Sequence, residues 1–317
     1  MFDIFQNSTR PNSNLFFCKN DANDVRLGEI VLSKSEDYEI CEIVILGCPQ
    51  DEGVARNNGR LGAALAPDAI RAQFYKLTNF SISAKIFDIG NTIIQETLEE
   101  THDVQTNIVK QMLKDGKTLI VLGGGNDISY PDGKALAEVF GNENWVAINI
   151  DAHFDVRSDF PRNSGTPYRQ LLDENLLKPT RFFEIAFQPQ AASPIYFKYL
   201  QKLKVNLASL EEVQNSKLKI QSLVENQRTK DTGKRNFFFG FDTDSVRASD
   251  APGTSAPSPI GLTAEEFIGL AKFAGRNKLT KLIEFTEMNP NFDIDNRTAK
   301  LVALAMHEFC AAQKQKS

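Results

Sequence analysis

The sequence contains little histidine, tryptophan or cysteine, and it has no excess of basic residues. Among 317 residues there are 3 His, 1 Trp and 4 Cys, with 36 Lys and Arg against 41 Asp and Glu. The formal net charge of −5 argues against nucleic acid as a partner, because phosphate binding requires a basic surface. No window approaches the ~18 successive apolar residues of a membrane span, so we expect no membrane association.

The cysteines form no CxxC pair and have no spacing typical of a disulfide framework. They therefore indicate reduced thiols in a cytoplasmic protein. Residues 1–7 lack the basic and apolar regions of a signal peptide, which also favours a cytoplasmic location. The four positions are Cys18, Cys41, Cys48 and Cys310.

Short apolar runs alternate along the chain with segments of helical period, which predicts an α/β fold with a parallel sheet covered on both faces. Residues 1–40 are polar and lack a period, so we interpret them as an irregular N-terminal arm; residues 41–317 are then one domain. The predicted strands are 42–47, 85–90, 118–122, 145–148, 181–186, 236–241 and 279–285. One helix is predicted to begin at residue 67, and others are predicted at 97–115, 131–140, 209–227, 263–275 and 297–315.

Polar clusters follow several of these strands, at residues 126–127, 151–157, 242–244 and 287–289. In parallel α/β folds, ligands bind beyond the carboxyl ends of the strands. We therefore expect the four clusters to meet in one site.

Asp151, His153 and Asp155 alternate along one cluster, and in an extended chain such side chains project together. Two carboxylates and an imidazole suit Mn²⁺, Zn²⁺ or Ni²⁺ better than Ca²⁺ or Mg²⁺. Asp242 and Asp244 repeat the arrangement after another strand. The alternative is a solvated acidic rim with a capping histidine, but crowded carboxylates without cations raise each other's pKa.

Two divalent ions that share bridging carboxylates would hold and acidify a water molecule between them. The resulting hydroxide is a nucleophile suited to attack on a planar carbon. We expect the other two histidines to be structural, with His102 at the start of a surface helix and His307 in the C-terminal helix.

The segments Gly-Gly-Gly-Asn-Asp at 123–127, Asp-Ala-His-Phe-Asp at 151–155 and Phe-Asp-Thr-Asp at 241–244 resemble the metal motifs of the ureohydrolase (arginase) family. This family includes arginase, agmatinase and formimidoylglutamase. The similarity extends from residue 43 onward. It implies a three-layer α/β/α domain with a mainly parallel sheet of about eight strands, two Mn²⁺ per subunit, and a homotrimer or homohexamer. The implied metal ligands are Asn126, Asp151, His153, Asp155, Asp242 and Asp244.

Further details resemble the formimidoylglutamase branch, whose small-molecule substrate is N-formimidoyl-L-glutamate. Residues 164–168 are similar to its SGTPF loop, and residues 251–257 are similar to its APGxSAP loop. The resemblance assigns substrate binding to Arg157, Ser164 and Glu287, and catalysis to Asp155 and Glu287. An arginine fork can also bind a carboxylate on general grounds. The alternative for Arg157 is an ion pair with a loop acid such as Asp159.

The family normally has histidine where this chain has Asn126, and a carbonyl oxygen is a weaker and harder ligand than imidazole. Three outcomes remain open: both metals are kept with an asparagine oxygen ligand; one metal is lost or the substrate differs; or the protein is a non-catalytic relative. Our leading hypothesis is hydrolysis of N-formimidoyl-L-glutamate to L-glutamate and formamide. The enzymatic alternative is a different guanidino or amidino substrate, as in arginase or agmatinase.

Overall fold

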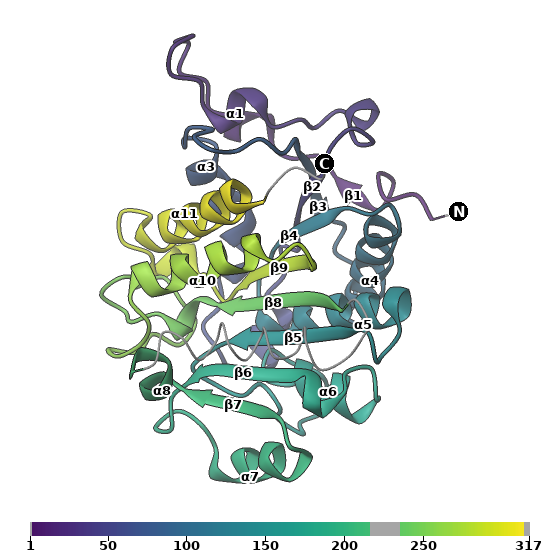
Figure 1. The fold of residues 1–317 in the computed structure, drawn as a ribbon, viewed down its shortest axis with the longest axis vertical. Helices are drawn as coiled ribbons and strands as arrows, with labels where there is room; N and C mark the ends of the chain where they lie inside the picture. Colours follow the sequence, from purple (N-terminus) through teal and green to yellow (C-terminus); the bar gives the residue numbers. More distant parts are fainter. Residues whose placement is uncertain (1, 216–234, 314–317) are drawn as a thin grey trace.

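The computed structural model describes residues 2–215 and 235–313. Within these residues one sheet has the strand order β1-β3-β2-β4-β9-β8-β5-β6-β7 (Figure 1). Every neighbouring pair is parallel except β1 and β3. The strands are β1 (Ser8–Thr9), β2 (Ile43–Gly47), β3 (Ile86–Thr92), β4 (Thr118–Leu122), β5 (Trp145–Ile150), β6 (Phe182–Phe187), β7 (Asn206–Ser209), β8 (Asn236–Asp242) and β9 (Thr280–Thr286).

Helices cover both faces of the sheet, with α10 and α11 on one side and α4 and α5 on the other (Figure 1). The longer helices are α3 (Ala66–Phe74), α4 (Leu98–Lys114), α5 (Ser129–Phe140), α7 (Pro194–Leu203), α10 (Ala264–Arg276) and α11 (Arg297–Ala312). The shorter ones are α1 (Leu27–Ile30), α2 (Glu52–Arg56), α6 (Pro167–Asp173) and α8 (Leu210–Asn215).

The core consists of two layers, because each central strand alternates its side chains between the faces. On β4, Ile120 and Leu122 belong to the layer under α3, α10 and α11, while Leu119 and Val121 belong to the layer under α4 and α5. All four are fully buried. A strand buried on both faces is apolar throughout, which is why these strands are visible as unbroken runs in the sequence. The predicted three-layer α/β/α fold is confirmed.

The seven predicted strands are present to within two residues at each end. The sheet has nine strands because two short edge strands, β1 and β7, lie in segments for which none is predicted. Helices α6 and α7 also lie in segments for which no helix is predicted. Of the helix predicted at 209–227, residues 210–215 form α8, and residues 216–234 lie outside the described part.

Residues 2–40, predicted as an irregular arm, run along one edge of the sheet and include β1, which pairs with β3. Gly90 makes this pairing possible: its φ is +94°, and a Cβ there would lie 1.7 Å from the Thr9 carbonyl oxygen. The end of the arm is tied by Lys117, whose ammonium donates to the backbone oxygens of Tyr38, Glu39 and Cys41 at 2.8–3.1 Å.

No helix among residues 2–215 and 235–313 is long and apolar enough to cross a membrane. What the fold does provide is a convergence of strand ends. β4, β9, β8 and β5 are consecutive in the sheet, so the residues that follow them emerge side by side.

Candidate metal centre

The four polar clusters expected from the sequence emerge from these four consecutive strands. Asn126 follows β4, Asp151 follows β5, Asp242 ends β8 and Glu287 follows β9. All four residues are at least 95% buried. The sheet order therefore explains why residues separated by up to 161 positions lie within hydrogen-bond distance, as Asn126 and Glu287 do.

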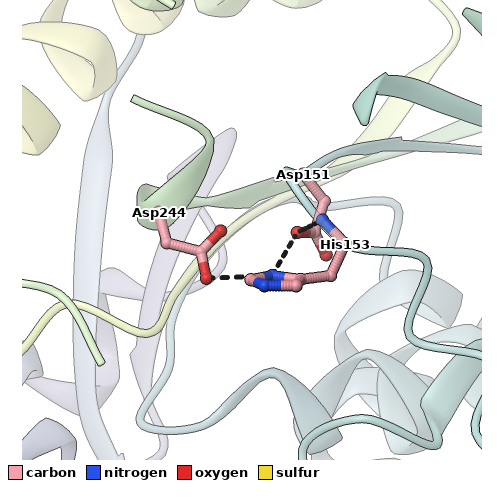
Figure 2. Close-up of side chains that lie close together, drawn as sticks. All are labelled: Asp151, His153 and Asp244. Carbon is pink, nitrogen blue, oxygen red and sulfur yellow. Dashed lines mark hydrogen bonds and ion pairs between the residues drawn. The ribbon is translucent and has the colours of Figure 1, made fainter. Parts of the chain in front are cut away.

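One group of possible ligands consists of Asp151, His153 and Asp244, whose ligand atoms all lie within 4.8 Å of one another. His153 Nδ1 is 3.5 Å from Asp151 Oδ1 and 3.2 Å from Asp244 Oδ2 (Figure 2). Backbone N–H groups orient two of the acids of the site: the His153 N–H donates to Asp151 Oδ1 at 2.7 Å, and the Asp244 N–H donates to Asp242 Oδ1 at 2.8 Å.

A second group consists of Asp151, Asp155 and Asp242, so that Asp151 is shared by both groups. The sequence predicts that Asp155 projects with Asp151 from an extended chain, and here the reason is different. β5 ends at Ile150, and Asp155 adopts the left-handed region with φ 46°. This left-handed backbone conformation, and not the alternation of a strand, accompanies the approach of its carboxylate to the site.

The site concentrates negative charge in a buried position. Burial, followed by the neighbouring carboxylates, raises the pKa of Asp155 and of Asp242 well above the usual range. Burial also raises the pKa of Asp244. The Asp244 carboxylate raises the pKa of His153. A buried cluster of acids around one imidazole is a costly arrangement unless further positive charge is supplied.

The residues fit two divalent cations. Two three-residue groups share one carboxylate, which is the arrangement that allows a bridging ligand. Asp244 Oδ1 is buried and has no hydrogen-bond partner among the described residues, so it is available for coordination. The donor atoms are mostly carboxylate oxygens with one imidazole nitrogen, a set that suits Mn²⁺.

Asn126 lies beside the second group, but its oxygen faces away from it. Its Nδ2 donates to Asp155 Oδ2 at 2.5 Å and lies 3.5 Å from Asp151 Oδ2. Its Oδ1 accepts from the hydroxyls of Ser129 and Thr286, both at 3.0 Å. Asn126 therefore lies beside the second ligand group, with its amide nitrogen facing the carboxylates and its oxygen facing the two hydroxyls.

A cavity of about 470 Å³ opens onto the carboxylates of Asp155, Asp242 and Asp244. Its lining includes the predicted residues Asp155, Arg157, Ser164 and Glu287. Glu287 is in the left-handed region with φ 61° and accepts from the Asn126 N–H at 2.9 Å; burial raises its pKa to about 7.

Arg157 and Ser164 both have protein partners at the cavity. The Arg157 Nε donates to Asp159 Oδ2 at 2.6 Å, which is the alternative considered from the sequence, and the guanidinium also lines the cavity. The Arg157 side chain is 49% exposed, so it remains accessible to a ligand. The Ser164 hydroxyl accepts from Asn57 Nδ2 at 3.1 Å.

Sequence reasoning missed several residues of the cavity, including Asn57, Asn58, Arg60 and Tyr196. The first three belong to the Gly-, Asn- and Arg-rich loop that follows β2. Its position after the carboxyl end of a strand is a signal that could have included it in the site. Tyr196 is on α7, which the sequence did not predict.

His102 lies on α4, whose outer face is exposed, but its own side chain is on the buried face of that helix and has a structural partner, as expected. His102 is only 1% exposed, and its Nε2 lies 2.7 Å from Asp127 Oδ2, which also accepts from Gln50 at 2.6 Å. It therefore supports the residue next to Asn126. His307 Nε2 lies 2.9 Å from the Thr78 carbonyl oxygen, in agreement with a structural role.

Comparisons of the sequence and of the fold with known proteins point to the same family. The arginase family matches residues 41–311. A formimidoylglutamase of Staphylococcus aureus (strain bovine RF122 / ET3-1) is 32% identical over 267 residues, which cover 84% of each chain. The crystal structure of Trypanosoma cruzi formiminoglutamase with Mn²⁺₂ has a TM-score of 0.83 and 32% identity, covering 92% of this chain and 100% of that one.

A variant of the Trypanosoma cruzi enzyme in which histidine replaces an asparagine, also with Mn²⁺₂, has the same TM-score of 0.83, with 32% identity and coverage of 92% and 98%. The formimidoylglutamase of Bacillus subtilis has a TM-score of 0.84 at 24% identity, covering 93% of this chain and 94% of that one, and so supports the fold alone.

Proposed function

This chain belongs to the arginase family, and we propose that within it the protein is a formimidoylglutamase, which hydrolyses N-formimidoyl-L-glutamate to L-glutamate and formamide. It is then a hydrolase of C–N bonds in linear amidines, with Mn²⁺ as cofactor. The observation that carries this proposal is the pair of ligand groups that share Asp151, beside a cavity lined by other acids of these groups and by Arg157.

In this proposal Asp151, His153 and Asp244 hold one Mn²⁺ of the pair, together with Asp242. The other is held by Asp151, Asp155, Asp242 and Asn126. Bound here, Mn²⁺ would acidify a water molecule and would supply positive charge that the acids of the site cannot provide. The buried acids of the site provide the negative charge that these cations require.

Water oxygen adds to the formimidoyl carbon, and the bond from that carbon to the glutamate nitrogen breaks. Asp155 holds the proton that passes to the leaving nitrogen, so that glutamate departs as an amine and the formimidoyl group as formamide. Glu287 faces the cationic amidine from the cavity wall. Its pKa of about 7 is lowered in turn when a cation binds beside it, which favours its charged form.

Arg157 binds a substrate carboxylate in this proposal, with Ser164 at the same wall of the cavity. What supports this assignment is that Arg157 lines the cavity and that its side chain is 49% exposed, although its Nε already pairs with Asp159 at 2.6 Å. An acidic substrate would displace the Asp159 carboxylate from the Arg157 guanidinium. Arg157 thus favours formimidoylglutamate over the neutral or basic substrates of other amidine hydrolases.

The remaining parts of the proposal concern assembly and location. We propose that the chain acts as a homotrimer or homohexamer in the cytoplasm, with residues 1–40 as an arm on the domain formed by residues 41–317. These statements rest on family resemblance. Light scattering of the purified protein distinguishes a trimer or hexamer from a monomer or dimer.

The reaction is tested by glutamate release from N-formimidoyl-L-glutamate with Mn²⁺-loaded protein, using Asp151→Ala as the blank and arginine and agmatine as competing substrates. We expect turnover with formimidoylglutamate alone, and none in the blank. Turnover of arginine or agmatine instead would identify the other amidine-hydrolase branch. Folded protein that binds Mn²⁺ but hydrolyses none of the three would indicate a non-catalytic relative.

A further inference from the structure

The Asn126 side chain is held between two acids on one side and two hydroxyls on the other. Its Nδ2 faces Asp155 and Asp151, and its Oδ1 accepts from Ser129 Oγ and Thr286 Oγ1 at 3.0 Å each. The two ends of an amide have nearly the same size, but the oxygen only accepts hydrogen bonds and the nitrogen only donates them. The surroundings therefore decide which end faces the carboxylates.

The Ser129 hydroxyl lies within hydrogen-bond distance of two acceptors but can donate to only one of them at a time. Its hydroxyl carries one hydrogen, yet Oγ lies 3.0 Å from Asn126 Oδ1 and 2.5 Å from Glu284 Oε1. If the hydrogen points to Glu284, the serine oxygen presents a lone pair to Asn126. An amide oxygen is then a poor neighbour, and an amide N–H is a good one.

The groups behind Glu284 determine where that hydrogen points. Thr92 donates to the side-chain oxygen of Gln105, so the Gln105 Nε2 is directed to Asp132 Oδ1 at 2.9 Å. Asp132 Oδ2 and Glu284 Oε2 are buried and have no hydrogen-bond partner among the described residues, and burial, followed by the Asp132 charge, raises the pKa of Glu284 well above its usual range. A proton on Glu284 Oε2 would serve Asp132 and leave Oε1 to accept from Ser129.

Rotation of the Asn126 amide by a half turn presents its N–H groups to the hydroxyl oxygens of Ser129 and Thr286 and leaves Asp151 and Asp155 to be paired by a cation. Nδ2 has two hydrogens, and the two hydroxyls of Ser129 and Thr286 are available to accept them. The rotation brings Oδ1 to the position beside Asp155 and Asp151. A cation held by these carboxylates attracts the amide oxygen and repels the N–H groups.

We propose that Ser129 and Thr286 are positioning residues that accept hydrogen bonds from the Asn126 amide and thereby turn its oxygen toward the second metal site. Glu284 fixes the direction of the Ser129 hydroxyl. This inference rests on the proposed function in that it assumes a cation beside Asp155, and it explains how an asparagine serves where an imidazole is usual.

The test uses the full-length, metal-stripped protein titrated with Mn²⁺ alone, with free Mn²⁺ measured by electron paramagnetic resonance. We expect two Mn²⁺ per chain in the wild type. Ser129→Ala and Thr286→Val should each weaken one of the two by about tenfold or more, the usual effect of removing a residue that orients a metal ligand. Thr280→Val is the matched control: Thr280 is a buried hydroxyl at the other end of β9, and its loss should leave both affinities unchanged.

The Asn126→Asp background separates positioning from a general structural effect. The two ends of a carboxylate are identical, so its orientation needs no control. In this background Ser129→Ala should change Mn²⁺ affinity by less than about threefold, giving a large coupling energy in the double-mutant cycle. Equal losses in both backgrounds would overturn the positioning role.

Glu284→Gln tests the direction of the hydrogen bonds. The glutamine amide can donate to Asp132 while its oxygen still accepts from Ser129, so Mn²⁺ binding should be retained. A loss as large as that of Ser129→Ala would contradict this direction. The inference and the function fail differently: a wild type that binds no Mn²⁺ overturns both, whereas two bound Mn²⁺ with these mutant effects but no glutamate release overturns the reaction alone.

Discussion

Two buried clusters of this protein are both built around aspartate, and they handle charge in opposite ways. In the first, Asp88 on β3 accepts from Arg71 Nε at 2.8 Å and from the Tyr75 hydroxyl on one oxygen. Its other oxygen accepts from Arg71 Nη2 at 3.1 Å and from the Gly90 N–H at 2.8 Å. The carboxylate is neutralised and fully hydrogen-bonded within the chain.

The second cluster, at the ends of β5 and β8, has an excess of acids. Asp151, Asp155, Asp242 and Asp244 surround one imidazole, and Asp244 Oδ1 lacks a partner in the part of the chain that the structure describes. A structural cluster includes its own counter-ion, because a buried charge left uncompensated is strongly destabilising. The comparison therefore indicates that the second cluster is completed by cations from outside the chain.

The largest expected effect is on catalysis. Asp242→Asn should lower the rate of glutamate release by about 10³- to 10⁴-fold, because loss of a metal ligand removes several kcal/mol of transition-state stabilisation. The rate is measured with saturating Mn²⁺ and compared with Asp293→Asn, an aspartate that caps α11. A rate within tenfold of the wild type would remove Asp242 from the metal site.

The same substitution should affect the free energy of unfolding much more in the first cluster than in the second. Asp88→Asn should reduce the free energy of unfolding by about 3–5 kcal/mol, because it leaves the buried Arg71 guanidinium without its charge partner. Asp242→Asn should leave the metal-free protein within about 1 kcal/mol of the wild type, since it relieves repulsion among acids.

Urea denaturation of both variants in EDTA measures this difference. Added Mn²⁺ should then stabilise Asp88→Asn as much as the wild type, and Asp242→Asn much less. Two variants that are equally destabilised without metal would contradict the distinction between the clusters.

Asp132 is another buried aspartate, and its hydrogen-bond donor, Gln105, is uncharged. Burial raises its pKa from the ordinary 3.8 to about 6, so the folded protein binds this proton more tightly than the unfolded chain does. Its stabilising contribution is therefore complete below about pH 4 and is lost as the pH rises through 6. Asp132→Asn does not titrate, so relative to the wild type it should become more stable by up to about 3 kcal/mol between pH 4 and pH 7.

Urea denaturation in EDTA across this pH range checks the prediction, with Asp115→Asn as a control for a less buried acid. A stability difference that does not vary with pH, or that varies in the opposite direction, would show that Asp132 is ionised throughout.

The sequence predicted the central sheet because each of its strands carries its own signal. β2, β4 and β5 are buried on both faces, so their residues are apolar except for Thr118 and Asn149. β1 and β7 contain Ser8, Thr9 and Asn206 and are strands only because a neighbouring strand pairs with them. Pairing partners far away in the chain leave no local pattern.

The candidate site shows the same division. Its acids were predictable because they are grouped after strands and resemble known motifs. The burial of His102 was not predictable, since its partner Asp127 is 25 residues away and only tertiary packing brings them together. The orientation of Asp155 was not predictable either. Its backbone is in the left-handed region, which glycine favours, and no glycine at this position marks that conformation in the sequence.

The smallest expected effects concern Arg157, the exposed counterpart of Arg71. Arg157→Ala should raise the KM for formimidoylglutamate by about tenfold with little change in stability, because a half-exposed ion pair contributes at most about 1 kcal/mol to folding. Asp159→Asn should lower KM by about threefold, since it removes the carboxylate that competes with the substrate for the guanidinium. Steady-state kinetics at several salt concentrations measure both changes. Opposite signs for the two variants support the exchange of one carboxylate partner for another. An increase of KM in both would mean that Asp159 holds Arg157 in its binding position, so that the ion pair prepares the site and does not compete with the substrate.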